Sequence, residues 1–423
     1  MQIHKTLRSR AAQAGLAAAL LAGAATFLIG QGAGPASAAP SNACAGPSVP
    51  PPPPTTTTTT TAPTTTTSTT EPPTTTTTEV EAEAVFNSQD VVAQEETTTT
   101  VEPTTTTTLP PPAHIPVLVT GALAGGGPHV KVIGAADGSL VRSFFAYDPN
   151  FHGGVNVALG DVDNDGYQDI ITAPGAGGGP HVRVFSGKTG VVIKELMAYD
   201  PTFTGGVSVA ACDVDDDGNA DIITGAGAGG GPHVKVFDGG ATNNATLASF
   251  FAYDPNFHGG VRVGSADING DGMADVVTGP GAGGGPHVRV FKIASGASSE
   301  LYGFMAYASN FTGGVFVGAN VGADQVARII TGAGPGGGQH VRVFGAFGGF
   351  APELAGIIPA GSGAQGGTVA IGQLDGDGAD EYAIGNASGS STVRTFNLPT
   401  TQIAASEAYP GFGGGVSVAV GVI

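Results

Sequence analysis

The chain has 423 residues, 71 of them glycine, with 15 Lys and Arg against 34 Asp and Glu, a formal net charge of −19. This balance excludes nucleic acid and anionic membrane surfaces as good partners and favours cations. With only two cysteines, Cys44 and Cys212, we expect no disulfide framework and a small buried side chain at Cys212.

Residues 1–38 have the organisation of a secretory signal peptide. Lys5, Arg8 and Arg10 precede the apolar run AAQAGLAAALLAGAATFLIG, and ASA follows at 36–38 as a cleavage site. A membrane-spanning helix is the alternative, but no basic flank follows the run. We therefore predict an exported chain, secreted or exposed at the cell surface, with no membrane span in its mature form.

Residues 39–112 are dominated by threonine and proline, as in PPPPTTTTTTTAPTTTTSTT. Such a composition cannot bury enough apolar area to offset the entropy of the chain. We predict a disordered, extended stalk. Clusters of threonine and proline in an exported protein suit O-glycosylation, and an unmodified linker is the alternative.

A repeat governs the remainder, residues 113–423. The motif GGGPHV or GGGQHV recurs every 52 to 54 residues, with its histidine at His129, His181, His233, His287 and His340. Each unit contains four apolar runs of four to six residues, rich in Val, Ile, Phe and Tyr and bounded by Gly, Pro, Asp or Asn. Such runs predict strands, and no helical periodicity appears after residue 112.

Four short strands in a unit of about fifty residues are typical of a β-propeller blade. The sequence thus predicts an all-β fold. The repeat enters midway through a unit at IPVLVTGALAGGGPHVKV and stops at GGVSVAVGVI, which supplies the missing first strand. Joining the two ends in one blade closes the ring without an open edge, and this gives six blades. Seven blades or an open solenoid are the alternatives, because the degenerate region around 347–363 must still supply a strand.

Three units carry a nine-residue acidic loop: DVDNDGYQD at 161–169, DVDDDGNAD at 213–221 and DINGDGMAD at 267–275. Oxygen side chains at positions 1, 3, 5 and 9 around a glycine at position 6 are what Ca²⁺ requires. Thr172, Thr224 and Thr278 stand where an EF-hand has glutamate, and a solvated acidic turn is the alternative. The predicted ligands are Asp161, Asp163, Asp165, Asp169, Asp213, Asp215, Asp217, Asp221, Asp267, Asn269, Asp271 and Asp275.

The two later loops depart from this pattern. The fourth, NVGADQVAR at 320–328, has Arg328 in the last ligand position, so we expect no ion there. The fifth, QLDGDGADE at 373–381, begins with Gln373 but retains Asp375, Asp377 and Glu381 as candidate ligands.

The order FHGGVNVALGDVDNDGYQDIITAPGAGGGPHVRVF resembles the FG-GAP repeat of integrin α-subunit propellers and of bacterial secreted proteins that share it. Phe151, Gly153 and Gly154 lie near the FG element, and Ala173 and Pro174 near the GAP element. The resemblance implies a β-propeller with calcium in the loop between the first two strands of a blade, and a role in adhesion or ligand binding. Integrin heads have seven units, whereas this sequence has six.

Loops should alternate between two faces, with the acidic loops on one face and the Gly-rich loops and the YDPNFHGG segments on the other. The second face carries repeated side chains: Tyr147, Tyr199, Tyr253, Tyr307, Asp148, Asp200, Asp254 and the five histidines of the repeat motif. Two interpretations are open, ligand recognition or packing repeated in every blade, and packing is favoured. His152 and His258 replace Thr204 and Thr312 of other units.

The functional prediction is a noncatalytic, exported, calcium-binding propeller that mediates adhesion or binds an extracellular protein or glycan. The alternatives are a secreted propeller hydrolase and a purely structural surface component. Against an enzyme, neither GxSxG nor HExxH occurs, and the acidic residues are already assigned to metal.

Overall fold

A computed structural model describes residues 114–346, 351–359 and 363–423, so the predicted signal peptide and stalk lie outside the described residues. The described residues form 24 strands in six four-stranded antiparallel sheets and contain no helix. No membrane-crossing helix of sufficient length and hydropathy therefore occurs in these ranges.

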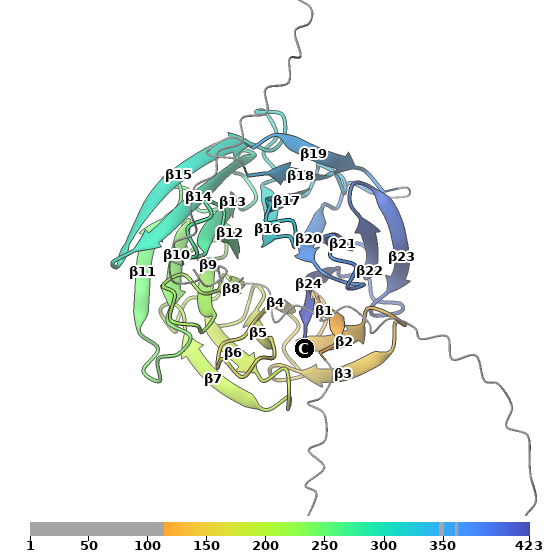
Figure 1. The fold of residues 1–423 in the computed structure, drawn as a ribbon, viewed down its shortest axis with the longest axis horizontal. Helices are drawn as coiled ribbons and strands as arrows, with labels where there is room; N and C mark the ends of the chain where they lie inside the picture. Colours follow the sequence, from red (N-terminus) through yellow and green to blue (C-terminus); the bar gives the residue numbers. More distant parts are fainter. Residues whose placement is uncertain (1–113, 347–350, 360–362) are drawn as a thin grey trace, which may run out of the picture. The chain divides into compact units, whose positions relative to one another are not determined.

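The strands follow the chain from the centre of each blade outward, and Figure 1 shows the six sheets around one axis. The first three sheets are β24 (Val416–Val422), β1 (Pro116–Ala122), β2 (His129–Gly134) and β3 (Leu140–Phe145); β4 (Val155–Gly160), β5 (Asp169–Pro174), β6 (His181–Phe185) and β7 (Val192–Met197); and β8 (Val207–Cys212), β9 (Asp221–Ala226), β10 (His233–Phe237) and β11 (Thr246–Phe251).

The other three sheets are β12 (Val261–Ala266), β13 (Asp275–Pro280), β14 (His287–Ala294) and β15 (Ala297–Met305); β16 (Val315–Val321), β17 (Ala327–Ala333), β18 (Val341–Gly345) and β19 (Glu353–Ile357); and β20 (Gly367–Gly372), β21 (Glu381–Asn386), β22 (Thr392–Asn397) and β23 (Thr401–Glu407). β19 is the strand that the degenerate region had to supply. The prediction of six four-stranded blades is confirmed.

The ring closes as the sequence predicts. β24 is the innermost strand of the sheet that begins with β1, and the two pair antiparallel from Pro116 opposite Val422 to Ala122 opposite Val416. The innermost strands β4, β8, β12, β16, β20 and β24 contact one another in sequence around the axis, and β24 also contacts β4. Closure pairs the edge of β1 that the chain order would otherwise leave open.

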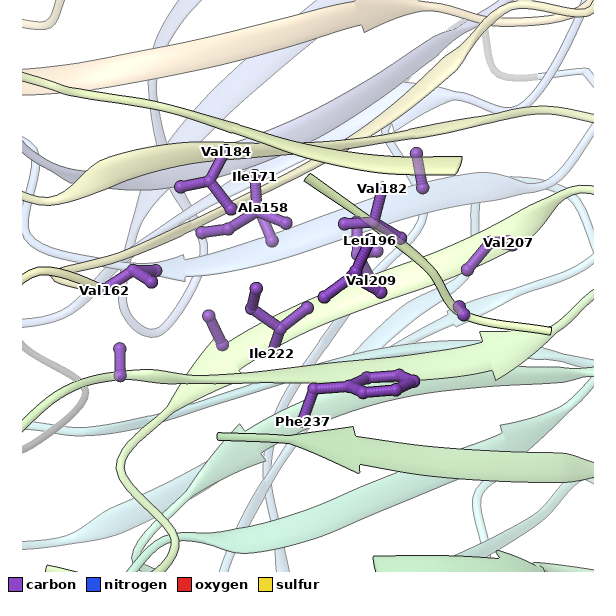
Figure 2. Close-up of a cluster of buried hydrophobic side chains, with 14 residues drawn as sticks. Ala158, Val162, Ile171, Val182, Val184, Leu196, Val207, Val209, Ile222 and Phe237 are labelled. Carbon is purple, nitrogen blue, oxygen red and sulfur yellow. The ribbon is translucent and has the colours of Figure 1, made fainter. Parts of the chain in front are cut away.

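The hydrophobic core lies between neighbouring blades. In one cluster, Ile171 of β5 and Val184 of β6 pack against Val209 of β8 and Ile222 of β9 (Figure 2). β5 and β9 are buried at every position because each has a blade on either side, which explains their continuous apolar sequences. The outermost strand β3 has exposed and half-buried positions only.

Close approach of adjacent blades requires glycine at the turn into each innermost strand. Gly154, immediately before β4, has a φ of 81°, and a Cβ there would lie 2.4 Å from the carbonyl carbon of Leu123 in the preceding blade. A larger residue would strain the backbone and separate the two blades.

Tyrosines repeated before the innermost strands connect each blade to the next. The hydroxyl of Tyr253 shares its one proton between the carbonyl oxygens of Thr278 (2.9 Å) and His287 (2.8 Å). Tyr147 makes the equivalent bonds to Thr172 and His181. The repeated tyrosines therefore serve packing, which the sequence analysis favoured.

We predict that Tyr253→Phe lowers the free energy of unfolding by about 1–2 kcal/mol, because two buried carbonyls lose a donor. Tyr302 is the matched control, since its hydroxyl is buried and has no hydrogen-bond partner among the described residues. Tyr302→Phe should be neutral or stabilising. Urea denaturation of both variants checks this, and equal effects would contradict the assigned role of Tyr253.

Cys212 at the end of β8 is fully buried, as expected. It is also disulfide-bonded, so it is not a free thiol. The other cysteine of the sequence, Cys44, lies outside the described residues.

Candidate metal centre

The first acidic loop connects β4 to β5 and brings three of its four predicted ligands together. Asp161, Asp163 and Asp169 each offer a carboxylate oxygen, and these oxygens lie within 4.8 Å of one another. Asp165 is not in this group: its Oδ1 accepts from the backbone N–H of Tyr167, and its Oδ2 lies 3.5 Å from the ammonium of Lys188.

Backbone donors hold this loop in shape. Asp161 accepts from the N–H groups of Asp165 (3.0 Å) and Gly166 (2.9 Å), which folds the loop back on itself. Gly166 has a φ of 87°, a conformation that glycine adopts without strain. Asp169, at the start of β5, accepts from Val162 N–H at 2.9 Å. Backbone N–H groups thus orient the carboxylates of Asp161 and Asp169.

The second loop repeats this arrangement between β8 and β9. Asp213, Asp215 and Asp221 bring carboxylate oxygens within 4.8 Å of one another. Asp213 accepts from Gly218 N–H at 2.9 Å, and Asp221 accepts from Val214 N–H at 2.8 Å. Asp217, like its counterpart in the first loop, lies outside the group of three.

The third loop, between β12 and β13, has partners of its own. The amide nitrogen of Asn269 donates to both oxygens of Asp275, at 3.2 and 3.1 Å. The ammonium of Lys292 on β14 forms an ion pair with Asp271. Asp267 accepts from Gly272 N–H at 2.8 Å, as the first residue does in the other loops. This loop therefore has an internal cation at one of its predicted ligands.

The fifth loop, between β20 and β21, contains a third carboxylate group, formed by Asp375, Asp377 and Glu381. Glu381 is fully buried, and its Oε2 accepts from Leu374 N–H at 2.7 Å. Its Oε1 is buried and has no hydrogen-bond partner among the described residues. Gln373 accepts weakly from Gly378 N–H, at 3.3 Å.

In the first, second, third and fifth loops, the carboxylate at the last position is buried beside other carboxylates, which disfavours its charged form. Burial raises the pKa of Asp169 to about 7, of Asp221 to about 8, of Asp275 to about 7 and of Glu381 to about 7. Neighbouring carboxylates of the same loop raise these pKa values further, against hydrogen bonds from backbone N–H groups. A positive charge between the carboxylates would reverse both effects.

The donor set fits a hard cation. Each group of three offers only carboxylate oxygens. The buried Oε1 of Glu381 has no hydrogen-bond donor among the described residues, and a metal ion would be a partner for it. The structure thus places acidic clusters that could hold a metal ion in three of the loops.

Part of the repeat region matches a known family. Residues 161–224 match the FG-GAP-like repeat. That range runs from Asp161 through β5, β6, β7 and β8 to Thr224 in β9, and so includes the first two acidic loops. The resemblance seen in the sequence is confirmed for this range.

Some of the solved structures that are similar to the chain are described as propellers. The structure of the Dos1 propeller shares 13% identity, covers 72% of this chain and 75% of its own, and has a TM-score of 0.38. A crystal structure of a nidogen/laminin complex shares 10% identity, with 72% and 98% covered and a TM-score of 0.46. A protein of unknown function from Bacteroides caccae shares 10%, with 72% and 98% covered and a TM-score of 0.44. The comparison with curated proteins gave no match.

In the fourth loop, Arg328 takes the place of the last carboxylate of the acidic-loop pattern. Arg328 of β17 forms an ion pair with Asp324 of its own loop and donates to Asp380 of the fifth loop at 2.8 Å. Asn320 donates to the other oxygen of Asp380, also at 2.8 Å. The side chain of Asp380 is fully buried, so the guanidinium supplies the charge that this carboxylate needs.

We predict that Arg328→Met lowers the free energy of unfolding by about 3–5 kcal/mol, because it leaves the Asp380 carboxylate buried and unpaired. Adding Asp380→Ala should recover most of the loss, since Ala220 and Ala274 occupy this position in the second and third loops. Thermal unfolding of the single and double variants measures the coupling. Additive losses would contradict it.

The two predicted faces are confirmed. Gly187 N–H, in the turn between β6 and β7, donates to Asp169 of the acidic loop at 3.1 Å. On the opposite side, Gly177 N–H of a Gly-rich loop donates to the carbonyl of Thr204 at 2.8 Å. There Asp148 accepts from Asn150 N–H, and His129 bonds to Ser143, so these repeated side chains also have local partners. His152 and His258 are exposed.

Sequence reasoning missed the basic residues that lie against the acidic loops. Lys188 and Lys292 follow the HVRVF motifs, in the turn or strand that reaches the acidic face. The signal was present, because the sequence analysis already placed those turns on the same face as the loops. A lysine at that place indicates an ion pair with the carboxylate at the fifth position of the acidic loop.

Proposed function

We propose that the protein is an exported, noncatalytic propeller whose acidic loops bind Ca²⁺ and whose opposite face binds an extracellular protein or glycan. The observation that supports it best is the three groups of carboxylates, each with ligand oxygens within 4.8 Å of one another. They occupy positions 1, 3 and 9 of the calcium pattern in the first two loops and positions 3, 5 and 9 in the fifth. Calcium would supply the positive charge that these buried groups lack.

The chain's own residues would do the rest. Asp161 and Asp169 would hold the ion of the first loop, with backbone donors fixing their orientation. Asp213 and Asp221 would act in the second loop, and Asp375 with Glu381 in the fifth. In the third loop, Asn269 and Lys292 compete with an ion for Asp275 and Asp271, so we expect weaker binding there.

Extracellular calcium modules bind with dissociation constants of about 0.1–1 mM, so each site would add on the order of 1 kcal/mol to stability at roughly 1 mM calcium. Calcium at this concentration outside the cell would stabilise the propeller, and we propose adhesion as the role of the stabilised form. Export rests on the signal-like residues 1–38, and presentation away from the surface rests on the Thr/Pro stalk.

A binding experiment tests the functional part of this proposal. The full chain, immobilised through its stalk, is exposed to arrays of glycans and extracellular-matrix proteins with calcium and with chelator. We expect saturable binding of one ligand class in calcium only. A panel of glycosidic and lactone substrates, run in parallel, tests the alternative of a propeller hydrolase. Calcium-dependent turnover of any of these substrates would overturn the noncatalytic assignment.

A further inference from the structure

A cavity lies at the axis of the propeller, where the innermost strands begin. Its volume is about 330 Å³, and residues of β4, β8, β12, β16, β20 and β24 all contribute to its wall. These are the strands that surround the axis in Figure 1. The volume is within the range of small-molecule sites. None of the predicted metal ligands lines it.

One position of the repeat that lines this wall varies between blades. The second residue after the conserved glycine differs from blade to blade, and the six residues are Asn156, Ser208, Arg262, Phe316, Thr368 and Ser417. Four of them bond to a neighbouring innermost strand: Asn156 to Val207 O, Ser208 to Val263 N–H, Thr368 to Val416 O and Ser417 to Val157 N–H. Packing between blades therefore explains these four.

Arg262 is not explained in the same way. Its guanidinium lies 3.7 Å from the centre of the Phe316 ring, and its one hydrogen bond, to Pro280 O, is 3.5 Å long. An arginine has five N–H donors. Within residues 114–346, 351–359 and 363–423, no carboxylate lies within ion-pair distance of Arg262, and no other charged residue lines the cavity.

The charge at this place is therefore uncompensated. Desolvation lowers the pKa of Arg262 to about 10, so the side chain remains a cation at neutral pH. In a chain with a net charge of −19, four other arginines, Arg183, Arg289, Arg328 and Arg342, each form an ion pair with a glutamate or an aspartate. A partly buried cation without a counter-ion is unfavourable unless an anion joins it.

We propose that the axial cavity binds a small monocarboxylate, with its carboxylate paired to Arg262 and its apolar part against the valines of the innermost strands. Guanidinium and carboxylate match in charge and in the geometry of two parallel hydrogen bonds. One cation in an otherwise uncharged wall favours a singly charged ligand over sulfate or phosphate. Valines such as Val261 and Val263 line the remainder of the wall. This site is independent of the calcium loops.

The test uses the full chain in excess calcium, with benzoate as the probe and benzamide as its uncharged counterpart. Ligand-observed NMR and calorimetry measure binding, and sulfate serves as the divalent anion. We expect saturable binding of benzoate, with no binding of benzamide and weaker binding of sulfate. Absence of benzoate binding up to about 10 mM would overturn the proposal, since one charge-assisted pair is still measurable there.

Variants decide whether Arg262 is responsible. Arg262→Met should weaken benzoate binding at least about tenfold, and Arg262→Lys should retain part of it. Arg142→Met is the control, because the Arg142 guanidinium donates to Ser186 O and Gly187 O outside the cavity. The Ser208→Asp variant provides the test if the methionine variant does not fold. Because Ser208 is adjacent to Arg262 through Val263, an aspartate there supplies an internal counter-ion and should abolish benzoate binding. Equal binding by wild type and these cavity variants, or tighter binding of sulfate, contradicts the assignment.

Discussion

Removal of residues 416–423 is expected to abolish cooperative unfolding of the propeller. These residues form β24, which closes the ring by pairing with β1 along seven residue pairs. Val416 and Val418 pack in the core beside the sheet of β20 to β23, and Ala419 and Ile423 pack beside β4 and β5. Their loss exposes the edge of β1 and two apolar faces together.

Circular dichroism and calorimetry of the truncated chain measure this effect. We expect no sharp calorimetric transition and exposed apolar surface. A synthetic peptide of residues 416–423, added in trans, should restore the transition in a concentration-dependent way. A truncated chain that unfolds cooperatively near the wild-type temperature would mean that the β1–β24 pairing does not close the fold.

The second large effect concerns pH in the absence of calcium. The pKa values of Asp169, Asp221, Asp275 and Glu381 are raised to about 7 or 8, above the ordinary values of 3.8 and 4.5. Between about pH 4 and pH 8 the folded chain therefore binds more protons than the unfolded chain. Stability is highest near the ordinary pKa values and falls as the pH rises through 7 to 8.

In chelator, we expect Tm to fall by at least about 10 °C from pH 5 to pH 8. Calcium should remove most of this fall, because it stabilises the ionised carboxylates, and its own affinity should increase over the same pH range. Asp221→Asn should flatten the curve in chelator, whereas Asp254→Asn, an exposed carboxylate on the opposite face, should leave it unchanged. A Tm in chelator that rises between pH 5 and pH 8 would contradict the raised pKa values.

The architecture could be predicted because it is repeated. Five copies of one motif fix the phase of the strands, and the position of β24 follows from where the last copy stops. The first and last residues of the acidic loops were also predictable, since backbone donors hold Asp161 and Asp169 in positions that the glycine turn dictates. In these places local and global requirements agree.

The features that could not be predicted are those that differ between blades. The pairing of Arg328 with Asp380 depends on contact between adjacent blades. Nothing in the sequence around Arg262 shows that its side chain lines the axis. Repetition therefore predicts the scaffold, and departures from repetition require the structure.

Direct measurement of calcium binding decides whether the acidic loops hold a metal ion. Isothermal titration of the full chain with Ca²⁺ should show at least three sites, one for each carboxylate group, and magnesium should compete weakly. The triple variant Asp163→Asn, Asp215→Asn and Asp375→Asn, which changes one ligand in each group, should lose most of this binding while retaining the strand content of wild type. Absence of calcium binding at millimolar concentration, or equal binding by the triple variant, would contradict the assignment of these loops to a metal.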